Sequence, residues 1–375
     1  MRYRGRIRFG GYRLLLTLVV SAVLALVGSL PSAYVLLVPG ETRGVGPMIT
    51  VQDEPGRETG FLMATVATRP ASRAMALLSL VHPRLEARRL HDLVGEGRTL
   101  EEYYELNRLL MEESQALAIL AAWRHLGRPV ELTGEGALVL RVSAQAPAAT
   151  VLRTRDVVVG VDAHPVRLAE DLAGYLAGIE PGQEVTLTVR REDQELALAV
   201  PTTAGRGRAE LGLETLTVGI TALGPRRITV DAGEVAGPSA GLAFALEIID
   251  RLLPGTDLSQ GGLVAVTGVL DRDGRVLAVG GVQQKTVAAE KAGARYFLVP
   301  AENAREASRA ARAMHIVAVN TVQEAVLRLQ ALGDRSSARE WAESGFRQGK
   351  RRCLISRVNS NCLTRLSISS LSSTS

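Results

Sequence analysis

Two glycine-rich turns, each leading into a helical stretch, constrain this chain more than any other feature. The first is Gly-Pro-Ser-Ala-Gly at 237–241, and the second is Gly-Gly-Val-Gln-Gln-Lys at 280–285. They place Ser239 where one helix begins and Lys285 inside a later helix. A lysine in an apolar setting loses its proton more readily and can then act as the base for a serine hydroxyl. The pair therefore indicates a Ser-Lys peptidase.

The surrounding residues, 211–333, alternate between short apolar runs and helical stretches. Strands are expected at 228–230, 263–270, 275–279, 296–299 and 315–319, and helices at 239–253, 282–291, 302–314 and 322–332. This alternation predicts an α/β (α+β) domain.

Residues 131–203 are β-rich instead. Strands are expected at 137–142, 156–161, 184–190 and 196–200, with one helix at 168–176. This order resembles a PDZ domain, which accepts an extended peptide as an added strand and holds its terminal carboxylate with backbone N–H groups. The expected carboxylate loop is Gly134-Glu135-Gly136. Arg155 and Ala163 replace two expected glycines, which puts the turn geometry and peptide binding in question.

The N-terminal region carries much of the basic charge. The net charge is +5, and residues 1–13 hold five arginines and no acidic residue. Residues 14–38 are uncharged, and roughly 20 apolar residues can cross a bilayer. Pro31 interrupts the run, so 14–30 is its helical part. We expect residues 1–40 to form a cytoplasmic start and a transmembrane anchor, with the body extracytoplasmic; a cleaved signal peptide is the alternative.

The remaining segments are expected to be accessory. Residues 41–130 are interpreted as an N-terminal extracytoplasmic region with a strand at 60–68 and a long amphipathic helix at 100–126. Residues 334–375 are basic and then serine-rich, which predicts a disordered tail. The only two cysteines, Cys353 and Cys362, lie in that tail, so the body has no thiol nucleophile and no cysteine-rich metal site.

Composition also limits the partners. The net positive charge comes from the two ends, since residues 14–333 carry a net charge of −5, and aromatic residues make up 4% of the chain, so no nucleic-acid partner is expected. Residues 281–286 lack the glycine that precedes the lysine of a phosphate-binding loop. The sequence therefore predicts no cofactor, no metal and no nucleotide. The expected partners are protein or peptide substrates and a membrane.

The run from 237 to 303 resembles the proteolytic domain of Lon proteases. The resemblance rests on Gly-Pro-Ser-Ala-Gly at 237–241, Thr-Gly at 267–268, Gly-Arg-Val-Leu at 274–277, Gly-Gly-Val-Gln-Gln-Lys at 280–285, Ala-Ala at 288–289 and Val-Pro-Ala-Glu-Asn at 299–303. It implies that Ser239 is the nucleophile, Lys285 the general base and Thr267 a support for the lysine. Ala236 stands where the family usually has an acidic residue, and Glu234 cannot be assumed to replace it.

The order of anchor, PDZ-like module and Lon-like domain is similar to that of bacterial PDZ-containing Lon-like peptidases, over roughly residues 12–332. This resemblance implies a membrane-anchored, ATP-independent serine endopeptidase whose PDZ-like module presents substrate. It also implies a ring-shaped homo-oligomer.

Three alternatives stay open. The Gly-x-Ser-x-Gly pattern also fits an α/β-hydrolase, in which Asp273 and His315 would complete a triad with Ser239. The chain could instead be a non-catalytic scaffold that binds peptides through its PDZ-like module. A third alternative is that the Ser-Lys site cleaves only its own chain.

Overall fold

The computed structural model describes residues 9–333 except 53–58, 82–84, 96–97, 193, 206, 254 and 256, and it describes side chains from residue 14 onward. The predicted disordered tail, with both cysteines, lies outside the described residues. So do the first four of the five N-terminal arginines.

The main sheet combines strands from two distant parts of the chain. Its order is β20-β19-β16-β3-β1-β4. Its strands are β1 (Pro31–Gly44), β3 (Phe61–Ser72), β4 (Glu86–Arg89), β16 (Val264–Val266), β19 (Tyr296–Pro300) and β20 (His315–Val319). Strands β3, β16, β19 and β20 are parallel, whereas β1 runs antiparallel to β3 and β4. Residues 31–72 thus belong to the same sheet as residues 264–319.

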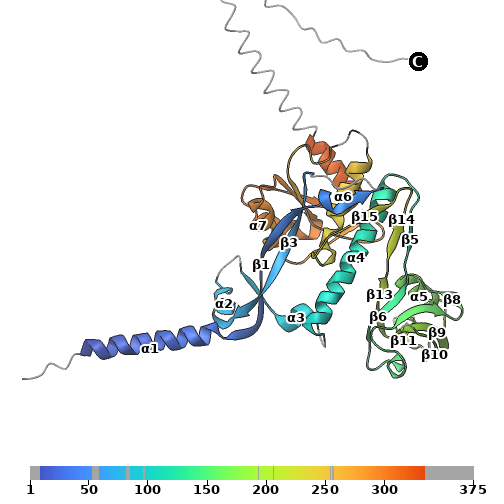
Figure 1. Cartoon of the computed structure of the whole chain (residues 1–375), viewed down its shortest axis with the longest axis horizontal. Helices are drawn as coiled ribbons and strands as arrows, with labels where there is room; N and C mark the ends of the chain where they lie inside the picture. Colours follow the sequence, from blue (N-terminus) through green and yellow to red (C-terminus); the bar gives the residue numbers. More distant parts are fainter. Residues whose placement is uncertain are drawn as a thin grey trace, which may run out of the picture. The chain divides into compact units, whose positions relative to one another are not determined.

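Helices pack on this sheet. Helices α7 (Val282–Lys291) and α8 (Ala304–Ala310) enclose an apolar cluster with Ala64, Ala265 and Phe297 of the strands. Helix α6 (Gly241–Leu252) packs against β3 and β16, and α4 (Leu100–His125) packs against α6. Figure 1 shows the blue strands β1 and β3 beside the orange α7, although more than 200 residues separate them in the sequence.

A buried ion pair ties the N-terminal segment to α6. Arg251 bonds Glu247 one turn away at 2.7 Å, and both side chains are buried. The same guanidinium donates to the carbonyl oxygens of Gly46 and Ile49, at 2.6 and 2.9 Å. A charge buried in this way needs all of its partners, so the fold depends on the segment around residues 46–49.

The second sheet has the order β10-β9-β7-β6-β13, and β8 pairs with β7. The elements are β6 (Gly136–Val142), β7 (Val157–Val161), β8 (His164–Pro165), α5 (Ala169–Leu176), β9 (Glu184–Arg191), β10 (Gln194–Pro201) and β13 (Leu213–Val218). These elements enclose a core of their own, drawn in green in Figure 1. The four predicted strands and the predicted helix of 131–203 are confirmed, and β13 is an additional strand.

Shorter elements connect these parts. The two-stranded pairs are β2 (Ile49–Val51) with β15 (Ile228–Val230), β5 (Glu131–Thr133) with β14 (Thr221–Leu223), β11 (Thr203–Gly205) with β12 (Arg208–Glu210), and β17 (Val269–Leu270) with β18 (Val276–Leu277). The short helices are α2 (Arg73–Leu78) and α3 (Leu90–Val94), with 3-10 turns at Gly46–Met48, Pro147–Thr150, Pro238–Ala240 and Ala301–Asn303.

The N-terminal apolar run divides at Pro31. Helix α1 covers Phe9–Ser29, and β1 begins at Pro31. The prediction that the apolar residues up to Val38 continue the anchor is wrong, because Leu36 is fully buried within the main sheet. The expected transmembrane span is not found either: none of the helices in the described residues has the length and apolar character needed to cross a membrane.

Several predicted elements match the structure closely. The amphipathic helix expected at 100–126 is α4, which Thr99 caps through a reciprocal pair of bonds with Glu102. The helix expected at 282–291 is α7, and the strand expected at 315–319 is β20. Residues 322–333 are helical, as predicted.

Candidate active site

A tight turn presents Ser239 at the start of α6. Gly237 has a φ of +98°, a conformation that side chains rarely allow, and the 3-10 turn that follows leads directly into α6. Helix α4 holds this turn from the side: the Gly237 N–H donates to the Asn107 carbonyl at 2.9 Å, and the Ser114 hydroxyl donates to the Pro238 carbonyl at 2.8 Å. The two residues that precede the serine are therefore both held by α4.

Helix α7 brings Lys285 to the serine. The helix begins after Gly281, whose φ is +64°, and a Cβ there would lie 2.7 Å from a methyl group of Val66 in β3. Glycine lets the helix approach the sheet at this point. The Nζ atom of Lys285 then lies 2.7 Å from the Oγ atom of Ser239. The structure thus brings together the two residues that the sequence singles out.

Thr267 completes the contacts of the lysine. It follows β16 at the carboxyl end of the parallel strands and is fully buried. Its Oγ1 atom accepts a hydrogen bond from Lys285 Nζ at 3.1 Å and donates to the Ser239 carbonyl at 3.2 Å. The Gly268 N–H donates to the same carbonyl at 2.9 Å. The threonine therefore links the lysine to the backbone of the serine.

Burial sets the protonation of the lysine. Lys285 is only 4% exposed, and this burial lowers the pKa of its ammonium from 10.5 to about 8. The described residues that line the surrounding cavity include no carboxylate that would favour the charged form. Glu234 is exposed and is not among them, so it does not take the place of the acidic residue that Ala236 replaces. A neutral amine is thus accessible near neutral pH.

The cavity in front of the serine has a volume of about 360 Å³. Its walls come from β1, β3, β4, α3, α4, the 237–241 turn and the residues before α7. Arg88 is the other cation of the lining, and its Nε atom is bonded to Glu86 at 2.7 Å. About half of these walls thus lie outside the segment in which the sequence located the site.

Sequence analysis missed Asn107, Ser114 and Arg88. Ser114 is 3% exposed and lies among the apolar residues of α4. A small polar residue on the buried face of an amphipathic helix was the one available signal, because such a group needs a buried partner. The Asn107 contact uses a backbone carbonyl, which no side-chain pattern reveals.

The alternative hydrolase triad is not assembled. His315 is exposed at the amino end of β20, where it pairs in register with Tyr296 and stacks on its ring. Ser239 contacts Thr267, which follows the carboxyl end of β16, and β19 separates β16 from β20. Asp273 is exposed in the turn between β17 and β18. The described residues also contain no cluster of His, Cys, Asp or Glu that could hold a metal ion.

The expected carboxylate loop at 134–136 has its donors already in use. The Glu135 N–H donates to the Val218 carbonyl at 2.8 Å, and the Gly136 N–H donates to the Arg167 carbonyl at 3.1 Å. These backbone groups cannot also bind a peptide carboxylate. The assignment of this loop as a peptide site is therefore wrong.

Comparison with known proteins identifies the two parts. Residues 227–331 match the Lon protease (S16) C-terminal proteolytic domain, and residues 124–202 match the PDZ domain. The chain carries a Lon-type proteolytic domain and a PDZ domain. The expected resemblance to the Lon proteolytic domain and to a PDZ domain is confirmed. The Lon-type match contains Ser239, Thr267 and Lys285, whereas the strands β1 and β3 lie outside it.

Individual relatives agree with this identification. The chain is 39% identical over 100 residues to a Lon protease of Citrifermentans bemidjiense, a match that covers 26% of this chain and 12% of the relative. It is 47% identical over 66 residues to a Lon protease of Clostridioides difficile, a match that covers 18% of this chain and 8% of the relative. The matched region is thus a small part of these relatives.

Solved structures match the PDZ part as well. One of them is the PDZ domain of the SdrC-like protein from Listeria monocytogenes, with 22% identity, a TM-score of 0.21, and coverage of 22% of this chain and 87% of that chain.

Proposed function

We propose that this protein is a serine endopeptidase in which Ser239 is the nucleophile and Lys285 the general base. The observation that carries the proposal is the 2.7 Å approach of a buried lysine amine, with a pKa of about 8, to the serine hydroxyl. The identity of the Lon-type domain supports it. The same geometry disfavours the hydrolase triad, whose members are apart.

The reaction follows from these contacts. Neutral Lys285 takes the proton of the Ser239 hydroxyl while the oxygen attacks the scissile carbonyl carbon. The lysine ammonium then gives this proton to the departing amine, which leaves an acyl-enzyme. Water, deprotonated by the same amine, releases the acyl group as a carboxylic acid and regenerates the serine.

The backbone around the serine can stabilise the oxyanion. The Ser239 N–H belongs to the first turn of the helical segment, and among the described residues no group accepts a hydrogen bond from it. A free N–H at a helix start favours a developing negative charge. We assign the Ser239 N–H as an oxyanion donor.

Strand β3 offers a place for the substrate backbone. Strand β16 pairs only with Phe61 to Met63 of β3, so the rest of β3 has no strand on that side within the described residues. Ala64, Thr65, Val66 and Thr68 of this free edge line the cavity. An extended polypeptide can add to the edge and bring one of its carbonyl groups to Ser239.

Cleavage of an unfolded protein tests the proposal. Purified protein should hydrolyse unfolded casein without nucleotide, since the chain has no phosphate-binding loop, and Ser239→Ala should be inactive. The Ser239→Ala/Lys285→Ala double variant should be no worse, because the two residues act as one unit. Activity that survives Ser239→Ala, or that requires ATP hydrolysis, would contradict the proposal. Inactivity of the wild type on every substrate except its own chain would favour the self-cleavage alternative.

Location and assembly stay predictions from the sequence. The arginine-rich start and the uncharged residues 14–30 support an extracytoplasmic body attached to the membrane, and α1 exposes many of its large apolar side chains. External protease added to intact spheroplasts should digest residues beyond 40. The resemblance to Lon-like peptidases supports a homo-oligomer, which light scattering can measure.

A further inference from the structure

Residues 75–81 expose an apolar surface shortly after the end of β3. Ser72 caps α2 by accepting a hydrogen bond from the Met75 N–H at 3.3 Å, yet none of the residues of this helix is buried. The exposed large apolar residues of the segment are Met75, Leu77, Leu78, Leu80 and Val81, and the last two are 80% and 78% exposed. Single exposed apolar residues are common, but a contiguous patch of them marks an interaction surface. We call residues 75–81 the apolar hook.

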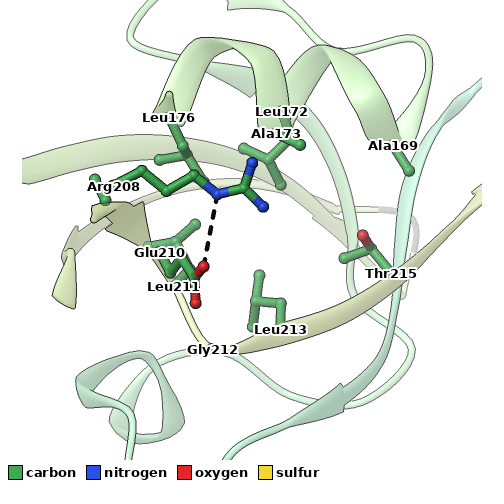
Figure 2. Close-up of a pocket in the computed structure, with 11 residues that line it drawn as sticks. Ala169, Leu172, Ala173, Leu176, Arg208, Glu210, Leu211, Gly212, Leu213 and Thr215 are labelled. Atoms are coloured by element: carbon green, nitrogen blue, oxygen red, sulfur yellow. Dashed lines mark ion pairs between the residues drawn. The ribbon is translucent and has the colours of Figure 1, made fainter. Parts of the chain in front are cut away.

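The short length of α2 does not explain this exposure. Helix α5 has eight residues against six in α2, and it buries Leu172 and Leu176. Figure 2 shows both leucines at the cavity between α5 and the segment from β12 to β13. A helix of this size can thus cover its leucines with its own chain. In α2 the described residues leave Leu77 and Leu78 uncovered.

The apolar hook continues the apolar surface of α1. The Arg73 N–H donates to the Leu30 carbonyl at 3.1 Å, and a Cβ at Gly28 would lie 3.2 Å from that of Ala74. The last turn of α1 is therefore in contact with the first turn of α2. Near this contact the exposed large apolar residues are Leu24, Leu26, Val27 and Leu30. The hook and α1 thus share one apolar surface.

The pattern of exposure on α1 favours lipid as the occupant of this surface. The exposed large apolar residues of α1 include two runs of neighbours, Leu14 to Leu16 and Leu18 to Val20. Successive residues of a helix point about 100° apart, so these side chains cover every side of α1. A protein partner, including a second copy of this chain, covers one face of a helix, whereas lipid chains contact all of its sides. The hook lies against this helix and is expected to meet the same surroundings.

The charge around the hook fits the same occupant. Arg69 and Arg73 are exposed just before it, and residues 61–81 include no acidic residue. Arginines beside an apolar segment bind the phosphate groups of anionic lipids while the apolar side chains enter the acyl region. The segment thus combines the two features of an interfacial membrane contact.

We propose that the apolar hook inserts into the surface of a bilayer that contains anionic lipids. Its apolar side chains enter the boundary between the headgroups and the acyl chains, and Arg69 and Arg73 bind phosphate groups beside it. Together with α1, the hook gives the body two points of attachment, which restrict rotation of the body about α1. The inference goes beyond the proposed peptidase activity, because no residue of the hook lines the cavity in front of Ser239.

Fluorescence quenching by lipids measures this insertion in the full chain. Cys353 and Cys362, the only two cysteines, are changed to serine, and Leu80→Cys carries an NBD fluorophore. The protein is reconstituted into vesicles of phosphatidylcholine and phosphatidylglycerol, with or without a nitroxide near the top of the acyl chains. The emission of the label should shift to the blue and be quenched by the nitroxide, because little water reaches that depth. A label at Leu223→Cys, an exposed leucine of β14, should show neither change.

A label in α1 separates the hook from the helix. Leu26→Cys with the same fluorophore reports on α1 alone. Quenching at residue 26 with none at residue 80 would overturn the inference, and so would the absence of quenching at both positions. A blue shift at residue 80 without quenching would mean that a second copy of the chain covers the hook, which would overturn the inference as well.

Substitutions within the hook complete the test. Leu77→Asp in the Leu80→Cys background should remove the quenching, because burying a carboxylate at that depth is costly. Leu327→Asp, at an exposed leucine outside the hook, should leave it unchanged. Neither change should alter the labelling of Ser239 by a fluorophosphonate probe, since neither residue lines the cavity. Quenching that persists in Leu77→Asp would overturn the insertion of the hook.

Vesicles without phosphatidylglycerol test the two arginines. Quenching at residue 80 should be weaker in these vesicles, because the attraction of Arg69 and Arg73 to anionic lipids is lost. Equal quenching in both kinds of vesicle would overturn the role of the arginines. Because none of these measurements needs cleavage, their failure is distinct from a failure of the peptidase proposal.

Discussion

At the residue scale, the environment of Lys285 links its proposed catalytic role to the stability of the fold. Burial lowers the pKa of its ammonium to about 8, whereas an unfolded chain keeps the lysine near its ordinary value of 10.5. Between these two pH values the unfolded state binds more protons than the folded state, so stability rises with pH in this window. Below about pH 8 both states are charged, and the full cost of burying the charge remains.

Lys285→Met tests this linkage. The variant should lose the rise in unfolding free energy between pH 8 and 10.5 that the wild type shows. At pH 7 the variant should be more stable than the wild type by up to about 3 kcal/mol, which is the free energy equivalent to the pKa shift. The loss of the two hydrogen bonds of the lysine reduces this gain. Urea unfolding across the pH range measures both effects. A wild-type stability with the same pH dependence as the variant would show that Lys285 is not desolvated.

Thr267 is expected to act as a positioning residue. Thr267→Val keeps the shape but removes the hydroxyl that bonds both Lys285 and the Ser239 carbonyl. We expect kcat to fall about 10- to 100-fold with KM little changed. The reason is that a hydrogen bond to a charged group stabilises it by roughly 1.5–3 kcal/mol, and Lys285 becomes charged during the reaction. The pH at half-maximal rate should shift downward, since the ammonium loses an acceptor.

Two further variants separate this role from folding. Thr267→Ser should restore most of the rate, because it retains the hydroxyl. Thr286→Val is the matched control: Thr286 is equally buried, but its hydroxyl bonds the Val282 carbonyl within α7. A similar loss of kcat in Thr286→Val would indicate a general packing effect.

At the element scale, two turns of the PDZ part keep a left-handed conformation without glycine. Arg155 and Ala163 have φ values of +75° and +65°. The sequence raised the question of whether these substitutions change the turns, and the structure shows that the backbone conformation is kept. Side chains with a Cβ adopt it at a cost of roughly 1–2 kcal/mol.

Ala163→Gly should therefore stabilise the protein by about 0.5–1 kcal/mol, once the greater freedom of glycine in the unfolded chain is included. The control is the same change at Ala173 in α5, which should destabilise by roughly 1 kcal/mol. Chemical denaturation of the PDZ part measures both. A destabilising Ala163→Gly would mean that its left-handed conformation carries no strain.

Local patterns predicted some elements well and others poorly. Helix α7 and strand β20 begin and end where the periodicity placed them, because their signals are local. The pairing of β3 with both β1 and β16 was missed, since the partner of a strand is set by packing between distant segments. Tyr34 to Val38 were interpreted as part of a membrane run because a buried strand is as apolar as a membrane segment.

The candidate site, like the fold, was predicted where its signals are local and missed where they come from distant segments. Ser239 and Lys285 follow from two motifs, and Thr267 from the family resemblance. The contacts from α4 were missed because they involve backbone groups and one small hydroxyl. The carboxylate loop was placed at 134–136 because glycines are frequent there, but the N–H groups of Glu135 and Gly136 are bonded to carbonyl oxygens of distant residues, which no local pattern reveals.

At the scale of the whole molecule, the proteolytic part depends on residues outside its family match. Strands β1 and β3 complete its sheet, and Gly46 and Ile49 satisfy the buried Arg251. A fragment of residues 211–333 should therefore lack a cooperative thermal transition, whereas residues 31–333 should retain one. Circular dichroism of the two fragments measures this difference. Cooperative unfolding of the shorter fragment would show that β1 and β3 are dispensable.

The most direct test of the Ser239–Lys285 pair is the rate at which a fluorophosphonate probe labels Ser239, followed by mass spectrometry in wild type and Lys285→Arg. No substrate needs to be known. The account predicts labelling of Ser239 that rises with pH through about 8, as the lysine loses its proton. It predicts a loss of at least about 100-fold in Lys285→Arg, because a guanidinium stays protonated in proteins. Labelling of Lys285→Arg at the wild-type rate would contradict the account.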